Sequence, residues 1–189
     1  IKDNPAVQSG LKGISTAFTK EVYHWMDMPD ETTFYRPLLI ASFCIEKALC
    51  DNDPIIAHLI NIMLYMIGLL ILYEFLSLLF KDKLSFTLAP LIITLLFAVH
   101  PIHTEVVANV KSRDEIMLLL FGMLSFWYLL KYLLKKRKMD YGISVLAFVL
   151  SLLSKESSAT LIFVFPLLLY FFTNNKKELM SRVKLFIPY

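Results

Sequence analysis

Long apolar runs, separated by short charged stretches, dominate the amino-acid sequence. A helix needs about 20 apolar residues to cross a bilayer core of about 30 Å. Five runs approach that length, and the pattern predicts a membrane-spanning helix for each of them. They cover residues 57–80, 84–99, 116–134, 141–153 and 159–172. The last two are short for independent spans, so the alternative for them is one helical hairpin that does not cross fully.

The segment before the first run has a different pattern. Within it, residues 35–49 (YRPLLIASFCIEKAL) place apolar or small side chains at near-helical spacing. This helix is too short to cross a bilayer and carries Glu46 and Lys47, so we expect it to lie along the membrane surface. These positions are Leu38, Leu39, Ser42, Phe43, Ile45 and Leu49. The chain thus divides into an outer loop with interfacial helices, residues 1–56, and a transmembrane region, residues 57–189.

Composition supports this division and excludes a soluble domain. Hydrophobic residues make up 57% of the chain and the mean hydropathy is +0.62, well above the usual apolar share of soluble proteins. The net charge of +3 comes from loops between apolar runs, which gives no indication of a nucleic-acid partner. We therefore predict an all-α, polytopic bundle of about five transmembrane helices whose first partner is the lipid bilayer.

The distribution of lysine and arginine predicts the orientation, because basic loops stay on the cytoplasmic side. One set of loops carries eleven basic residues and the other set carries three. The eleven are Lys81, Lys83, Lys131, Lys135, Lys136, Arg137, Lys138, Lys176, Lys177, Arg182 and Lys184, and the three are Lys111, Arg113 and Lys155. Residues 1–56, 100–115 and 154–158 should then share the non-cytoplasmic side.

The two cysteines lie on the predicted surface helix. Cys44 and Cys50 are six residues apart, or about 9 Å along a helix axis. A disulfide cannot span that distance. We expect two free thiols.

Ionisable side chains concentrate in the stretch HPIHTEVVANVKSRDE, residues 100–115, directly after the second run. Pro101 should end the preceding helix and leave His100, His103 and Glu105 at the membrane surface. These three residues form either an ordinary polar cap or part of a site. They are weak as metal ligands because no second ligand cluster accompanies them, so we expect no metal ion and no other cofactor.

Three cations in separate outer segments suggest an anion site. Arg36, Arg113 and Lys155 each lie beside apolar sequence, where an unpaired charge is costly. Together they would hold a phosphate, with arginine giving bidentate contacts. Their acidic neighbours Asp114, Glu115 and Glu156 provide the alternative, in which carboxylates cap a helix and pair with the cations.

Four motifs in this order resemble the transmembrane and tetratricopeptide-repeat O-mannosyltransferases of the C-type (GT-C) glycosyltransferase superfamily. They are YRPL at 35–38, HLIN at 58–61, FAVHPIHTEVVANVKSRDE at 97–115 and LSKESS at 153–158. The HPxHxE motif of that family is matched in full, whereas Ser112 stands where the family has glycine before arginine. The resemblance spans nearly the whole chain and implies an integral membrane glycosyltransferase.

The resemblance implies transfer of a sugar, typically mannose, from a polyprenyl-phosphate donor to a hydroxyl of a protein or glycan acceptor. It implies catalytic roles for His100, His103 and Glu105, with Arg36, Arg113 and Lys155 on the lipid phosphate. Supporting positions are Tyr35, His58, Asn61, Asp114, Glu115 and Glu156. His58 and Asn61 share a helix face, and an interhelical hydrogen-bond pair is the simpler interpretation of them. The family's catalytic acidic pair is expected before Ile1, and its repeats are expected after the membrane region.

The alternatives are a transporter or channel and a non-catalytic membrane assembly module. A transporter predicts ionisable residues deep inside several spans, yet only Glu74 and Lys131 approach that, both near the predicted cytoplasmic end. A multi-pass enzyme of this type would occupy the inner or plasma membrane of a bacterium or the endoplasmic reticulum membrane of a eukaryote.

Overall fold

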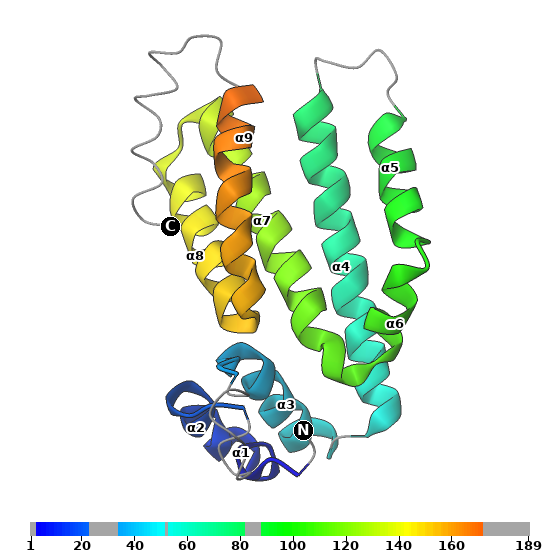
Figure 1. Cartoon of the computed structure of the whole chain (residues 1–189), viewed down its shortest axis with the longest axis vertical. Helices are drawn as coiled ribbons and strands as arrows, with labels where there is room; N and C mark the ends of the chain where they lie inside the picture. The colour runs from blue at the N-terminus through cyan, green and yellow to red at the C-terminus, as the bar shows by residue number, and fades with distance from the viewer. Residues whose placement is uncertain (1–2, 23–33, 52, 82–87, 172–189) are drawn as a thin grey trace.

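The computed structural model describes residues 3–22, 34–51, 53–81 and 88–171, and these residues form helices with no strand among them (Figure 1). Long helices run side by side, and a small group of short helices lies across one end of them. The prediction of an all-α membrane bundle is confirmed.

The small group consists of α1 (Pro5–Gln8), the 3₁₀ helix η1 (Gly10–Gly13), α2 (Ile14–Thr19) and α3 (Pro37–Cys50). Pro37 begins α3, since proline is pre-organised for the first helical turn. The α3 helix buries one face against α1 and α2 and contacts the ends of α7 and α8. The shared core contains Ala6, Val7, Ala17, Val22, Leu39, Ile40, Phe43 and Cys44.

The helix predicted over residues 35–49 is therefore present, as α3. Ile45 and Leu49 are exposed, whereas Glu46 is only 3% exposed. The buried face of α3 follows Leu39, Phe43 and Glu46, which are three or four residues apart and so share a side of the helix. Cys44 and Cys50 are both free thiols, as the spacing predicts.

The longest helices are α4 (Pro54–Phe80) and α7 (Arg113–Lys135), which pack against each other. The Asp53 side chain caps α4 by accepting a hydrogen bond from the Ile55 amide at 2.8 Å. Asp114 and Glu115 in the first turn of α7 suit the positive end of its helix dipole. Figure 1 shows that both helices begin at the end of the bundle beside α3 and run in the same direction.

The α7 helix also packs along α8 (Lys138–Ser154), and the chain then continues through the 3₁₀ helix η4 (Glu156–Phe163) into α9 (Val164–Phe171). Reciprocal hydrogen bonds join Ser125 and Ser144 in the α7–α8 interface: each hydroxyl donates to the other residue's carbonyl, at 2.9 and 2.7 Å. The surrounding core consists of Leu72, Phe75, Leu76, Phe126, Leu129, Leu130, Leu133, Phe148, Phe165 and Leu168.

Beside α4 lies a broken helix pair, α5 (Ala89–Ala98) and α6 (Ile102–Ala108), bent by 64°. The break falls at Pro101, which the sequence predicts as the end of the helix. A short 3₁₀ helix, η3 (Val110–Ser112), joins α6 to α7. This connection places residues 100–112 at the same end of the bundle as α3 (Figure 1).

Among the described residues, α4 and the stretch Val110–Lys135 are each long and apolar enough to cross a membrane, and α5 with α6 would pass as one bent span. The predicted spans 141–153 and 159–172 correspond to shorter helices, so a total of five spans stays a prediction. The 3₁₀ geometry of η4 was not expected. Lys83, residues 84–87, Phe172 and the basic residues Lys176, Lys177, Arg182 and Lys184 lie outside the described residues.

Candidate functional site

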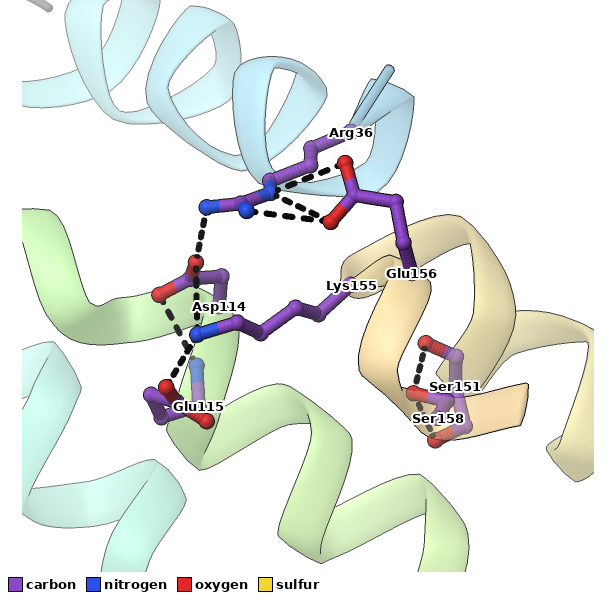
Figure 2. Close-up of polar contacts among 7 residues, drawn as sticks. All are labelled: Arg36, Asp114, Glu115, Ser151, Lys155, Glu156 and Ser158. Carbon is purple, nitrogen blue, oxygen red and sulfur yellow. Dashed lines mark hydrogen bonds and ion pairs between the residues drawn. The ribbon is translucent and has the colours of Figure 1, made fainter. Parts of the chain in front are cut away.

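An ion-pair network occupies the end of the bundle where α3, α7 and η4 meet (Figure 2). Arg36 precedes Pro37, so its backbone is non-helical, with φ −131° and ψ 66°, and its guanidinium is directed toward α7. Its Nη1 lies 2.6 Å from Asp114 Oδ2. Its Nε and Nη2 donate to Glu156 Oε2 at 3.1 and 3.0 Å. One guanidinium thus joins the segments that carry YRPL, SRDE and LSKESS.

Lys155 enters the same network from the other side. Its ammonium pairs with Glu115 and lies 3.7 Å from Asp114 Oδ2, the atom that also contacts Arg36. The Asp114 side chain is 5% exposed, whereas those of Glu115 and Glu156 are 42% and 46% exposed. Asp114 is therefore the buried centre of the network, and the other two carboxylates form its solvent-facing rim.

Two serines fix the turn that presents Lys155 and Glu156 (Figure 2). The Ser151 hydroxyl in α8 donates to the Ser158 hydroxyl at 2.9 Å, and the Ser158 hydroxyl donates to the Ser151 carbonyl at 2.8 Å. Both side chains are completely buried. Because these bonds cross the junction of α8 and η4, they hold the charged pair at a defined position over α7.

The charge of Glu156 is stabilised within this network. Partial burial raises the pKa of its carboxyl, but the hydrogen bond from Arg36 and the positive charges of Arg36 and Lys155 together hold the pKa below the ordinary glutamate value. Glu156 is consequently ionised at neutral pH. With Arg36 and Lys155 as cations and three carboxylates, the network has a formal charge of −1.

Arg113, the third predicted phosphate ligand, lies apart from Arg36 and Lys155 in a buried pair. Its side chain is 1% exposed, and its Nη2 lies 2.6 Å from Glu46 Oε2 on α3. Its Nε donates to Asn61 Oδ1 on α4 at 2.8 Å, and its guanidinium stacks over the Phe43 ring at 4.2 Å. Arg113 therefore ties the start of α7 to α3 and α4.

His100, His103 and Glu105 lie on the neighbouring α5–α6 connection. The His103 ring lies 4.3 Å from the Phe97 ring and 5.9 Å from the rings of His100 and Tyr65, measured between centroids. His100 and Glu105 are exposed. Within the part of the chain that the structure describes, no group of three His, Cys, Asp or Glu side chains is arranged to hold a metal ion.

The remaining predicted positions have separate roles. The Tyr35 hydroxyl donates to the Phe18 carbonyl at 2.8 Å and so ties the segment just before α3 to α2. Asn61 is completely buried and makes the interhelical hydrogen bond to Arg113, whereas His58 is exposed on the same helix. The interhelical hydrogen bond expected on this helix face is thus present at Asn61.

Sequence reasoning missed three contributors to this region: Glu46, Ser151 and Ser158. The sequence marks Glu46 only as a charged residue on the predicted surface helix, whereas its spacing from Leu39 and Phe43 places it on the buried face of α3. That spacing was the available signal. For Ser151 the sequence offers none, because a serine in an apolar run is equally compatible with a lipid-facing or a buried position. Ser158 is part of the LSKESS motif, but the motif does not indicate that Ser158 pairs with Ser151.

Comparison with known proteins assigns the chain to a family. A family model described as dolichyl-phosphate-mannose-protein mannosyltransferase matches residues 37–189. Human Protein O-mannosyl-transferase TMTC1 is 33% identical over 146 residues, which cover 75% of this chain and 15% of the human protein. Mouse TMTC4, also named a protein O-mannosyl-transferase, is 40% identical over 103 residues, which cover 49% of this chain and 14% of that protein.

A third relative, Protein O-mannosyl-transferase F38B6.6 of Caenorhabditis elegans, is 30% identical over 157 residues, or 82% of this chain and 22% of that protein. The chain thus spans less than a quarter of the length of each of these relatives. No solved structure matches it. The resemblance to the GT-C O-mannosyltransferases is confirmed, and the chain belongs to the dolichyl-phosphate-mannose-protein mannosyltransferase family.

Proposed function

We propose that the protein containing this chain is an integral membrane mannosyltransferase that uses a polyprenyl-phosphate-linked donor. The acceptor is a protein hydroxyl, and transfer occurs on the non-cytoplasmic side, at the endoplasmic reticulum membrane in a eukaryotic host. The observation that carries this proposal is the network of Arg36, Asp114 and Lys155. It assembles three separate outer segments at one end of the bundle, where a lipid-linked phosphate would lie at the membrane boundary.

The chemistry of the reaction requires cations at such a position. Breaking a sugar–phosphate bond develops negative charge on the departing lipid phosphate, and fixed cations stabilise that charge more strongly in the transition state than in the ground state. Arg36 offers a bidentate fork and Lys155 a point charge. Asp114, buried between them, keeps both side chains oriented toward the same space.

The rim carboxylates leave room for a phosphate. Glu115 and Glu156 are more than 40% exposed, and exposed ion pairs contribute only about 0–1 kcal/mol. If both turn toward solvent, Arg36, Lys155 and Asp114 retain a formal charge of +1. A lipid phosphate would then replace the two glutamates as the partner of the cations.

Arg113 is proposed as a positioning residue rather than a phosphate ligand, because Glu46 and Asn61 already bind its guanidinium inside the protein. His100, His103 and Glu105 would line the acceptor side of the site. A carboxylate must also deprotonate the acceptor hydroxyl. The family resemblance implies that this base belongs to the acidic pair expected before Ile1.

The test uses the full-length protein with a polyprenyl-phosphate mannose donor and a protein acceptor. Replacing Arg36 or Lys155 by alanine should lower turnover by about 10- to 1,000-fold, comparable to the loss of one strong transition-state contact. Arg36→Lys should recover part of it, since the charge remains but the fork is lost. Lys47→Ala is the matched control: Lys47 lies on α3, which directly follows Arg36, and its ion pair among the described residues is with exposed Asp51.

Glu156→Gln separates the phosphate role from a purely structural ion pair. If Glu156 competes with the donor phosphate for Arg36, its removal should lower the KM for the donor and leave kcat largely unchanged. If the network only stabilises the fold, Glu156→Gln should impair activity in parallel with Arg36→Ala. Well-folded Arg36→Ala and Lys155→Ala proteins with full turnover would refute the phosphate site.

A further inference from the structure

A second polar feature lies at the other end of the bundle, in a groove between the C-terminal halves of α4 and α7. Its volume is about 350 Å³, within the range of ligand pockets, about 300–1,000 Å³. Lys81, Lys131 and Lys135 line it together with Glu74 and Trp127. The rest of the lining is Ser77, Leu78 and Leu134.

The charge of this groove is poorly compensated. Among the described residues, none of its three lysines lies within 4.0 Å of a carboxylate oxygen. The Lys131 ammonium instead lies over the Trp127 ring at 3.4 Å and near the Tyr128 ring at 4.6 Å. Glu74 in the lining and Asp140 at the start of α8 attract Lys131 electrostatically. Counting both acids, the groove retains a formal charge of +1.

The groove is distinct from the Arg36–Asp114–Lys155 network. Lys131 follows Asp114 by seventeen residues on α7, which is about 25 Å along the helix axis. The sequence places this end on the cytoplasmic side, and the exposed residues Lys136, Arg137 and Lys138 continue its positive charge. Trp127 and Tyr128 are residue types enriched at membrane–water interfaces.

We propose that this groove binds the headgroup of an acidic phospholipid. Basic pockets between transmembrane helices on the cytoplasmic side suit such headgroups, because that leaflet carries the anionic lipids. The three lysines would contact the phosphate, while Trp127 and Leu134 would face the glycerol and upper acyl region. Both α4 and α7 contribute to the groove, so the lipid would act as a bridge between them at this end.

The experiment measures binding of phosphatidylserine to the full-length protein in detergent at about 0.15 M salt, where charges beyond about 8 Å are screened. The variant Lys81→Gln/Lys135→Gln removes two exposed groove lysines without changing the core. We expect its affinity to fall about 25-fold, since each lysine contributes about fivefold. Phosphatidylcholine should bind weakly to both proteins.

Lys136→Gln/Lys138→Gln is the matched control, because it removes the same charge from exposed positions at the same end but outside the groove. Its affinity for phosphatidylserine should change by less than about threefold, because neither side chain lines the groove and salt weakens the attraction of charges that do not contact the headgroup. Equal losses in both variants would overturn the proposal in favour of diffuse attraction. Displacement of the lipid by inorganic phosphate alone would overturn it in favour of a simple anion site.

Discussion

At the scale of single residues, Arg36 and Arg113 carry the same charge in opposite surroundings. Arg36 is 17% exposed and shares its guanidinium between Asp114 and the rim residue Glu156. Arg113 is enclosed by Glu46 and Asn61 and has no exposed partner among the described residues. The first arginine can exchange a partner for a ligand. The second cannot do so without opening the contact between α3, α4 and α7.

The buried pair yields a stability prediction. Arg113→Met leaves Glu46 as an uncompensated charge inside the protein, so it should destabilise the fold by about 3–5 kcal/mol. The double variant Arg113→Met/Glu46→Leu removes both charges and should recover most of that loss, because apolar side chains of similar volume often replace a buried pair without cost. Thermal unfolding of the full-length protein in detergent measures both effects.

Lys47→Ala, which breaks only an exposed pair with Asp51, should stay within about 1 kcal/mol of the parent protein. If the double variant Arg113→Met/Glu46→Leu lost as much unfolding free energy as the two single variants together, Arg113 and Glu46 would act independently. That outcome would contradict the role of the Arg113–Glu46 pair in joining α3 to α7.

The sequence predicts the cations of the site better than their partners. Arg36, Arg113 and Lys155 stand out because they lie beside apolar segments, and two of the three meet at Asp114 in the structure. Which cation meets which carboxylate depends on tertiary packing between segments far apart in the chain: Arg36 and Glu156 are separated by 120 residues. Residue type and local spacing hold no information about that pairing.

At the scale of elements, the short N-terminal helices depend on a close backbone approach. A Cβ at Gly13 would lie 1.8 Å from the Ala6 carbonyl oxygen and 2.5 Å from its carbonyl carbon. Because both atoms belong to the backbone of α1, they cannot move aside as a flexible side chain would. Gly13 thus allows η1 and α1 to pack together beneath α3.

Gly13→Ala should therefore destabilise the N-terminal group by about 1–3 kcal/mol, the usual cost of overpacking. Gly142→Ala is the control, since nothing lies within 4 Å of a Cβ at that position in α8 and alanine favours a helix interior by about 0.5–1 kcal/mol. Limited proteolysis and thermal unfolding should show faster cleavage before α3 only for Gly13→Ala. Comparable behaviour of both variants would contradict the close-approach argument.

Helix positions follow from apolar periodicity, and the break at Pro101 follows from the missing amide of proline. The break after Ser154 follows from the polar residues 154–158 between two apolar runs, but the 3₁₀ geometry of η4 does not follow from periodicity. The start of η4 is held by the hydrogen bonds between Ser151 and Ser158, which form only once α8 and η4 pack together. An apolar run such as residues 159–172 is equally compatible with either helix type until that packing is known.

At the scale of the whole molecule, the two ends of the bundle differ in chemistry. At the end beside α3, cations and carboxylates pair with one another. At the opposite end, lysines and Trp127 line a basic groove. The α7 helix joins them, beginning at Arg113 and ending at Lys135. The basic groove lies at the end that the distribution of lysine and arginine predicts to be cytoplasmic.

The orientation is tested with single cysteines at the two ends of α8, in a full-length protein whose native cysteines are replaced. Ser157 and Arg137 are both exposed and flank this helix, whose seventeen residues extend about 26 Å, close to the bilayer core of about 30 Å. The count of basic residues places Arg137 in the cytoplasm. In sealed vesicles with the non-cytoplasmic face outward, an impermeant thiol reagent should label Ser157→Cys and spare Arg137→Cys, and detergent should make both reactive. Equal labelling before detergent would show that α8 does not cross, and preferential labelling of Arg137→Cys would reverse the orientation.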